Sequence, residues 1–157
     1  THLWSRPHLI SSFQQLTSSD TPVTIILTDI DDFKQINDSY GHDCGDYILS
    51  ELSSILRYRC PKDTAICRWG GEEFVIMFPE EDTKALRKRI DHLRRYISDY
   101  PFHHGKQALH ITMTFGISST AEADTLSDLV KLADKRMYYG KNNGKNTVIT
   151  SDTKLPV

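Results

Sequence analysis

Two short runs of strand-forming residues lie close together in the middle of the chain. They cover residues 64–69 and 74–78, and the tetrapeptide Gly70-Gly71-Glu72-Glu73 separates them. Runs of β-branched and aromatic residues joined by a short glycine-containing segment are typical of an antiparallel hairpin. The chain is therefore expected to contain a sheet, with an acidic pair directly after the turn.

The remaining segments predict the order in which helices and strands alternate. Residues 23–27 read as a buried strand, and residues 111–117 alternate like a half-buried one. Apolar residues recur at helical spacing over 46–59 and again over 82–100, where Asp82 is placed to cap the helix. A histidine-containing loop is expected over residues 103–105.

The order strand, helix, strand, strand, helix, strand predicts a ferredoxin-like βαββαβ core. The fold class is thus α/β (α+β), with a central, mostly antiparallel sheet flanked by helices. A last helix, from Leu126 to about Tyr138, and a closing strand around Val148 follow this core. In this topology the first and third strands are antiparallel neighbours, so Asp29 should lie beside Glu72 although the two are far apart in sequence.

Length, cysteine usage and charge exclude several classes of protein. The 157 residues suit one domain, and no run approaches the roughly 18 apolar residues of a membrane span. The three cysteines, Cys44, Cys60 and Cys67, form no Cys-x-x-Cys pair, which argues against a disulfide framework and a zinc site. A net charge of −2 gives no general attraction to nucleic acid. We expect a cytoplasmic domain with no nucleic-acid partner.

The expected meeting of carboxylates from two strands suits Mg²⁺. This ion prefers oxygen ligands and commonly binds through one or two carboxylates plus substrate phosphates. For residues 29–32 alone, a solvated acidic turn is the alternative, because aspartates are common in turns. Gly70 and Gly71 can serve a tight turn or the close approach of a ligand. The functional and structural interpretations of Gly70-Gly71-Glu72-Glu73 remain equally open.

Several polar and basic residues outside the carboxylates could bind a nucleotide. Residues 33–38 resemble a short helical turn that directs Lys34 towards the carboxylates, where it could neutralise phosphate charge. Asn37 and Asp46 could hydrogen-bond a guanine edge, although Asp46 could equally be a helix cap. Lys141 and Lys145 bracket a glycine- and asparagine-rich loop and could contact phosphates, although exposed lysines beside a turn usually bind nothing specific.

The basic residues of the segment 82–100 are interpreted as a solvated helix surface. They are Arg87, Lys88, Arg89, Arg94 and Arg95. The chain contains no His-Glu-x-x-His, Gly-x-Ser-x-Gly or P-loop sequence, which argues against the corresponding zinc enzymes, serine hydrolases and nucleotide hydrolases.

Two long motifs resemble those of the GGDEF family of diguanylate cyclases, in its GGEEF variant. The first covers residues 29–46 and the second residues 68–74. Residues 112–117, 133–134 and 140–146 resemble later motifs of the family, so the likeness extends over nearly the whole chain. It implies that residues 1–157 are a single GGDEF catalytic domain with a palm-type, nucleotidyl-cyclase-like fold.

The resemblance also implies roles for the acidic residues. Asp29, the Ile30 carbonyl and Glu72 would hold Mg²⁺, with Mn²⁺ as an alternative. Glu72 would in addition help to deprotonate the attacking 3′-hydroxyl, Glu73 would support the metal site, and Lys34 would stabilise the transition state.

By the same resemblance, Asn37 and Asp46 would recognise guanine, and His42 would lie at the nucleotide. Lys141 and Lys145 would hold the triphosphate. Arginine is usual where Lys145 stands, and lysine keeps the charge but loses the planar fork of donors.

The implied reaction condenses two GTP into cyclic di-GMP and two pyrophosphates. The 3′-hydroxyl of one GTP attacks the α-phosphorus of the other, and two domains must face each other as a homodimer, formed transiently or through an upstream region. The alternatives are a GTP-binding regulatory or protein-interaction module without catalysis, and a cyclase of a different purine nucleotide.

Two departures from the family pattern lead to further expectations. The family's product-inhibition motif, Arg-x-x-Asp, would fall on residues 61–64 and is not matched, so feedback through that site should be weak or absent. Residues 1–6 resemble the end of an opening motif, with His2 and Ser5 replacing glycine and asparagine. We therefore expect a fragment of a longer protein with an upstream sensor domain, whose full length could be anchored in the inner membrane.

Overall fold

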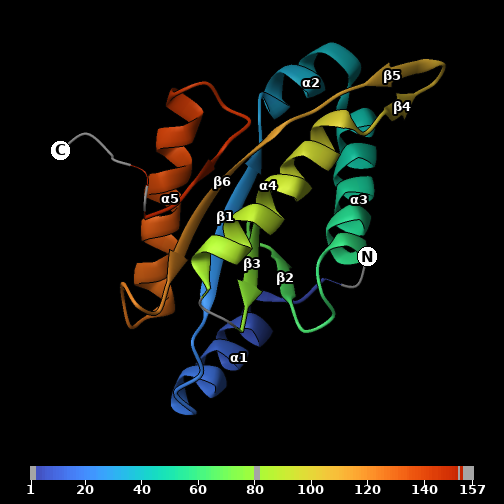
Figure 1. The fold of residues 1–157 in the computed structure, drawn as a ribbon. Coiled ribbons are helices and arrows are strands. Elements are labelled where there is room, and N and C mark those ends of the chain that lie inside the picture. The colour runs from blue at the N-terminus through green and yellow to red at the C-terminus, as the bar shows by residue number, and fades with distance from the viewer. Residues whose placement is uncertain (1–2, 80–81, 152, 154–157) are drawn as a thin grey trace.

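A five-stranded sheet with helices on both faces forms the centre of the molecule (Figure 1). The computed structural model describes residues 3–79, 82–151 and 153. Its elements are α1 (Arg6–Ser18), β1 (Thr24–Ile30), α2 (Phe33–Tyr40), α3 (His42–Arg59), β2 (Ala65–Arg68), β3 (Glu73–Phe78), α4 (Thr83–Asp99), β4 (Phe102–His104), β5 (Gln107–Leu109), β6 (Met113–Ser119), α5 (Leu126–Asn142) and β7 (Val148–Ile149).

The strand order β2-β3-β1-β6-β7 confirms the predicted ferredoxin-like core. β1 is antiparallel to both β3 and β6, and β2 forms the predicted hairpin with β3. β7 adds to the sheet edge in parallel with β6. The first and third strands are therefore neighbours, as the topology requires.

Alternating residues of each strand pack into two separate cores. Ile26 and Ile30 of β1 belong to the core under α3 and α4, whereas Ile25 and Leu27 belong to the core under α1 and α5. Successive side chains of a strand point to opposite faces, so a sheet covered on both faces buries nearly all of them. For this reason every residue of β6 is buried, and the expectation of a half-buried strand was wrong.

The contact between β6 and α5 is close because Gly116 has no side chain. A Cβ atom at this position would lie 2.0 Å from the Ala133 carbonyl oxygen and 2.7 Å from the Met137 nitrogen. Real Cβ atoms do not come this close to backbone, so only glycine fits here without displacing α5. Since α5 carries Lys141, Gly116 also helps to position the candidate site.

The structure corrects two further expectations and adds one helix that was not predicted. The loop expected over residues 103–105 is part of a small hairpin, β4–β5. The predicted helix from Asp46 begins at His42, after Gly41, whose φ of 92° allows the sharp turn from α2. The patterns above assigned no element to α1, although Ser5 caps it by accepting a hydrogen bond from the His8 amide (3.3 Å).

Two further observations concern the described residues. Among the described residues, no helix combines the length and apolar character needed to cross a membrane. The three cysteines are free and buried. Of the two departures from the family's opening motif, His2 lies outside the described residues, and Ser5 is the residue that caps α1.

Candidate active site where β1 meets β3

Carboxylates from two strands meet where β1 ends and β3 begins. Asp29 of β1 is the register partner of Glu73, the first residue of β3, and Glu72 precedes it directly. Asp29 lies two residues after Leu27 in β1, and Glu73 lies two residues before Val75 in β3. Both therefore lie on the face of the sheet that α5 covers. The topology thus brings together residues that are more than 40 positions apart in sequence.

The negative charge of this cluster is only partly neutralised. Burial raises the pKa of Asp29, Glu72 and Glu73 above their ordinary values. The charge of Asp29 raises the pKa of both glutamates further, and Asp134 of α5 adds to the effect on Asp29 and Glu73. Lys141 acts in the opposite direction without cancelling these effects. A bound cation would therefore be favoured here.

Lys141 lies among these carboxylates. Its ammonium group is 2.8 Å from Asp31 Oδ1 and 3.2 Å from Asp29 Oδ1, and it also approaches the Asp29 carbonyl oxygen (3.4 Å). Lys141 belongs to the last turn of α5 and not to the loop that follows it. The ammonium group of Lys141 therefore already lies where the carboxylates converge.

Asp31 is the most extensively bonded carboxylate of the site, and sequence reasoning gave it no role. It accepts hydrogen bonds from Thr112 Oγ1 (2.6 Å), Thr114 Oγ1 (2.7 Å) and the Asn146 amide (2.9 Å), besides Lys141. Burial acts to raise the pKa of Asp31, but the hydrogen bonds from Lys141, Thr112 and Thr114 and the charge of Lys141 together lower it. The alternation of threonines at positions 112 and 114, opposite the end of β1, was the available signal.

Replacing Asp31 with asparagine should lower the free energy of unfolding by about 2–4 kcal/mol at neutral pH. The asparagine NH₂ group would face hydrogen-bond donors, and Lys141 would keep only its ion pair with Asp29. Because the folded-state pKa of Asp31 lies below its usual 3.8, its stabilisation is present above about pH 4 and is lost as the pH falls through the folded-state value.

Chemical denaturation of both proteins from pH 7 to pH 2.5 would measure this difference, with exposed Asp63→Asn as the control. We expect the gap between parent and Asp31→Asn to narrow on acidification. A gap that is absent at pH 7, or that widens below pH 4, would contradict the role given to Asp31.

Two arginines hold the glycine turn between β2 and β3. Arg68 donates from Nε (3.0 Å) and Nη2 (2.6 Å) to the Gly71 carbonyl oxygen. Arg6 donates from Nε to the Trp69 carbonyl oxygen (3.1 Å), and its guanidinium lies 4.0 Å from the Trp69 ring centroid. Neither Gly70 nor Gly71 has a positive φ, so the turn does not require glycine for backbone angles. Nothing lies within 4 Å of a Cβ built on Gly71, which leaves room beside the main chain.

The corner between α2 and α3 brings the predicted guanine-binding residues together. A Cβ on Gly45 would lie 1.9 Å from Asn37 Oδ1, so the glycine allows α3 to pack directly on Asn37. Asn37 Oδ1 is buried without a hydrogen-bond partner among the described residues. Asp46 is exposed one helical turn after the α3 N-terminus, so its alternative interpretation as a helix cap was wrong.

The three remaining predicted residues occupy exposed or partly exposed positions. His42 is exposed at the first residue of α3, and Lys34 is exposed in the first turn of α2. Lys34 makes no hydrogen bond or ion pair with any described residue. Lys145 forms an ion pair with Asp32, which ties the loop after α5 to the start of α2. Such an exposed pair contributes little to stability, so the Lys145 ammonium can change partners.

The oxygen ligands of the site suit a hard divalent cation such as Mg²⁺, whose remaining ligands would come from a bound phosphate group. Within residues 3–79, 82–151 and 153, no group of three or more histidine, cysteine, aspartate or glutamate side chains is arranged to hold a metal by itself. Mg²⁺ commonly needs only one or two carboxylates when phosphate oxygens supply further ligands. Asp29, the Ile30 carbonyl and Glu72 offer hard oxygen ligands of this kind.

Comparison with known proteins gives consistent results. The family model "Diguanylate cyclase, GGDEF domain" matches residues 1–147. Response regulator PleD of Caulobacter vibrioides is 38% identical over 144 residues, which cover 90% of this chain and 32% of that protein. Diguanylate cyclase A of Treponema denticola is 32% identical over 135 residues, covering 85% of this chain and 36% of that protein. The chain thus spans about a third of the length of these relatives.

Solved structures agree in fold. The active GGEEF domain of a diguanylate cyclase from Vibrio cholerae superposes with a TM-score of 0.87 at 28% identity, covering 98% of this chain and all of that one. The GGDEF domain of DgcB from Caulobacter crescentus, solved with c-di-GMP, gives a TM-score of 0.89 at 24% identity, covering 98% and 91% of the two chains. The likeness to DgcB supports the fold alone.

Proposed function

Because the chain belongs to the GGDEF family of diguanylate cyclases, we propose that it condenses two molecules of GTP into cyclic di-GMP and releases two molecules of pyrophosphate. The observation that carries this proposal is the meeting of Asp29 with Glu72 and Glu73 at the neighbouring ends of β1 and β3. The free cysteines suit a cytoplasmic domain, where GTP is available.

In each step the 3′-hydroxyl oxygen of one GTP forms a bond to the α-phosphorus of the other, and the bond from that phosphorus to pyrophosphate breaks. Glu72 accepts the hydroxyl proton, and its raised pKa makes it a stronger base than an exposed glutamate. Asp29, the Ile30 carbonyl and Glu72 would hold Mg²⁺ or Mn²⁺, which when bound stabilises charge on phosphate oxygens. Glu73 supports that ligand set through its position opposite Asp29.

The lysines bind and neutralise the triphosphate. Lys34 has no other partner among the described residues, so its charge is available to the transition state. Lys141 and Lys145 are paired with Asp29, Asp31 and Asp32 and would transfer hydrogen bonds from these carboxylates to phosphate oxygens. The pairing keeps both ammonium groups at the site before substrate arrives.

Guanine recognition is assigned to Asn37 and Asp46. The unpartnered Asn37 Oδ1 is a buried acceptor, and such a group favours a ligand that donates to it. The Asp46 carboxylate can accept from the ring N–H and the amino group of guanine together. Adenine offers no such adjacent pair of donors.

Asp46→Asn should raise the KM for GTP by about tenfold or more and reduce the preference for GTP over inosine triphosphate, which lacks the amino group. The matched control is Asp43→Asn, an exposed aspartate in the first turn of the same helix. Initial rates with both nucleotides would measure the effect. Equal loss with GTP and inosine triphosphate would place Asp46 outside the guanine contact.

The reaction requires two copies of the domain, because each holds one GTP and the two half-sites must face each other. An upstream region that brings two copies together is part of this proposal. The rate of cyclic di-GMP formation per mole of protein should therefore rise with protein concentration before reaching a plateau. A specific rate that does not change over a hundredfold dilution would argue against a transient dimer.

A further inference from the structure

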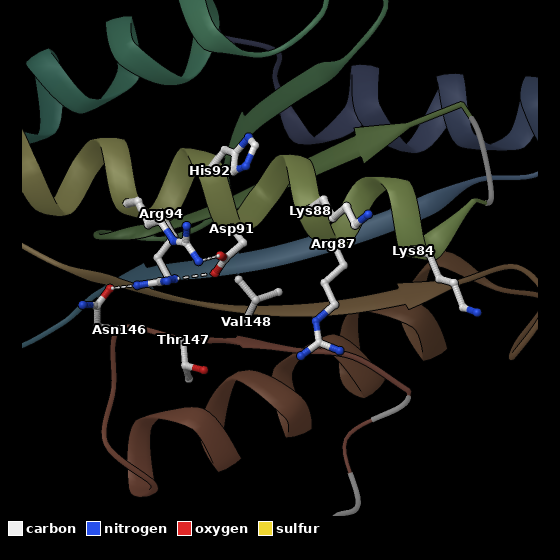
Figure 2. A pocket seen from close by; sticks show the side chains of 10 residues that line it. Lys84, Arg87, Lys88, Asp91, His92, Arg94, Asn146, Thr147 and Val148 are labelled. Carbon is white, nitrogen blue, oxygen red and sulfur yellow. Dashed lines mark hydrogen bonds and ion pairs between the residues drawn. The ribbon is translucent and has the colours of Figure 1, made fainter.

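A basic hollow lies between α4 and the segment that leads into β7 (Figure 2). Its volume is about 720 Å³, within the range of small-ligand sites. Among the described residues, five lysine and arginine side chains line it, together with His92 and one aspartate, Asp91. The five are Lys84, Arg87, Lys88, Arg94 and Arg95.

The single carboxylate does not neutralise this charge. Asp91 already forms ion pairs with Arg94 Nε (2.9 Å) and Arg95 Nη2 (2.9 Å). Arg87 and Lys88 make no ion pair with any described residue, and both are exposed. The hollow therefore holds an excess of positive charge that an anion would neutralise.

The basic residues were interpreted from sequence as a solvated helix surface, but the structure places a wall opposite them. Asn146, Thr147 and Val148 form this wall. Figure 2 shows Arg87 extending from α4 towards the side of Thr147 and Val148, and Arg94 reaching Asn146. Charges that converge on a concave surface concentrate their potential more than charges that radiate into solvent.

The chemistry of the hollow selects for phosphate. Guanidinium groups bind phosphate oxygens through two parallel hydrogen bonds, and ammonium groups add point charges. Among the described residues, the lining contains no phenylalanine, tyrosine or tryptophan on which a nucleic-acid base could stack, and the ring that it does contain is that of His92. We propose that this hollow is a second anion site that binds an oligophosphate, a compound with two or three linked phosphate groups.

A chain of hydrogen bonds joins the hollow to the candidate active site. Arg94 Nη1 donates to Asn146 Oδ1 (2.9 Å), and the Asn146 amide donates to Asp31 Oδ2 (2.9 Å). Asp31 in turn binds Lys141 (2.8 Å). An anion that engages Arg94 therefore changes the surroundings of a residue that holds the active-site lysine.

Calorimetric titration of the protein with inorganic tripolyphosphate, in EDTA and without GTP, would test the site. The variant Arg87→Ala/Lys88→Ala should bind tripolyphosphate about tenfold or more weakly than the parent, because each substitution removes a charged hydrogen-bond donor. Arg94 is left intact because it supports Asn146. The matched control is Lys131→Ala/Lys135→Ala, which removes the same charge from exposed positions of α5 and should change the affinity by about twofold or less.

Amide chemical shifts would locate the same binding event. Tripolyphosphate should shift the signals of Asn146 and Thr147 in the parent and in the control pair. Binding that is unchanged in Arg87→Ala/Lys88→Ala, equal loss in both pairs, or no binding by the parent would each overturn the proposal. Lys141 and Lys145 of the candidate active site can also bind tripolyphosphate, so binding is assigned to the hollow by the difference between Arg87→Ala/Lys88→Ala and its control pair, and that difference does not depend on cyclase activity.

Discussion

Replacing Glu72 with glutamine is expected to reduce the rate of cyclic di-GMP formation by about 10²- to 10⁴-fold. Glutamine has nearly the same shape as glutamate, but it cannot accept the proton of the 3′-hydroxyl and is a poor ligand for a divalent cation. The loss should fall mainly on kcat, because the guanine contacts at Asn37 and Asp46 are unchanged.

The same substitution should not destabilise the fold. Burial and the charge of Asp29 raise the pKa of Glu72, so the ionised carboxylate lowers the free energy of unfolding instead of raising it. Removing that charge should leave the free energy of unfolding unchanged or slightly higher. Asp99→Asn, an exposed aspartate at the end of α4, is the control and should keep full activity. Near-parental activity of Glu72→Gln would remove Glu72 from the mechanism.

Replacing Gly116 with alanine should lower the free energy of unfolding by about 3 kcal/mol or more. The added Cβ would lie 2.0 Å from the Ala133 carbonyl oxygen and 2.7 Å from the Met137 nitrogen. Both atoms belong to the backbone of α5 and cannot move independently of the helix. The clash can be relieved only by moving α5 away from β6, which also displaces Lys141 from Asp31 and Asp29.

Gly71→Ala is the matched control for stability, because a Cβ at Gly71 meets nothing within 4 Å and φ is not positive there. Its free energy of unfolding should remain within about 0.5 kcal/mol of the parent. Urea denaturation monitored by circular dichroism would compare the free energies of unfolding of the parent, Gly116→Ala and Gly71→Ala. If Gly116→Ala were as stable as Gly71→Ala, the close packing of α5 on β6 would be contradicted.

Much of the fold could be predicted because its signals are local. Glycine between two apolar runs predicted the β2–β3 hairpin, and Asp82 caps α4 as expected by accepting from the Ala85 amide (3.1 Å). The pairing of β1 with β3 followed from topology alone, and with it the meeting of Asp29 and Glu73. Residues from distant positions could thus be placed together without a structure.

Other features depended on contacts that no sequence pattern records. The contacts of Lys141 with Asp29 and Asp31 were not predicted, because they depend on the length of α5 and on its packing on β6, which bring the last turn of α5 to the end of β1. The role of Asp31 depends on Thr112, just before β6, on Thr114 within β6, and on the Asn146 amide, which is more than 100 positions away in sequence. The small β4–β5 hairpin was missed because it is short, polar and largely exposed.

The measurement that most directly tests the proposed activity is mass spectrometry of the nucleotides formed when concentrated protein is incubated with GTP and Mg²⁺. Cyclic di-GMP and pyrophosphate from the parent, with almost none from Glu72→Gln, is the predicted result. If the parent binds GTP but forms no cyclic di-GMP at any protein concentration, even when fused to a dimerising segment, the domain is a GTP-binding regulatory module and the proposed activity is wrong.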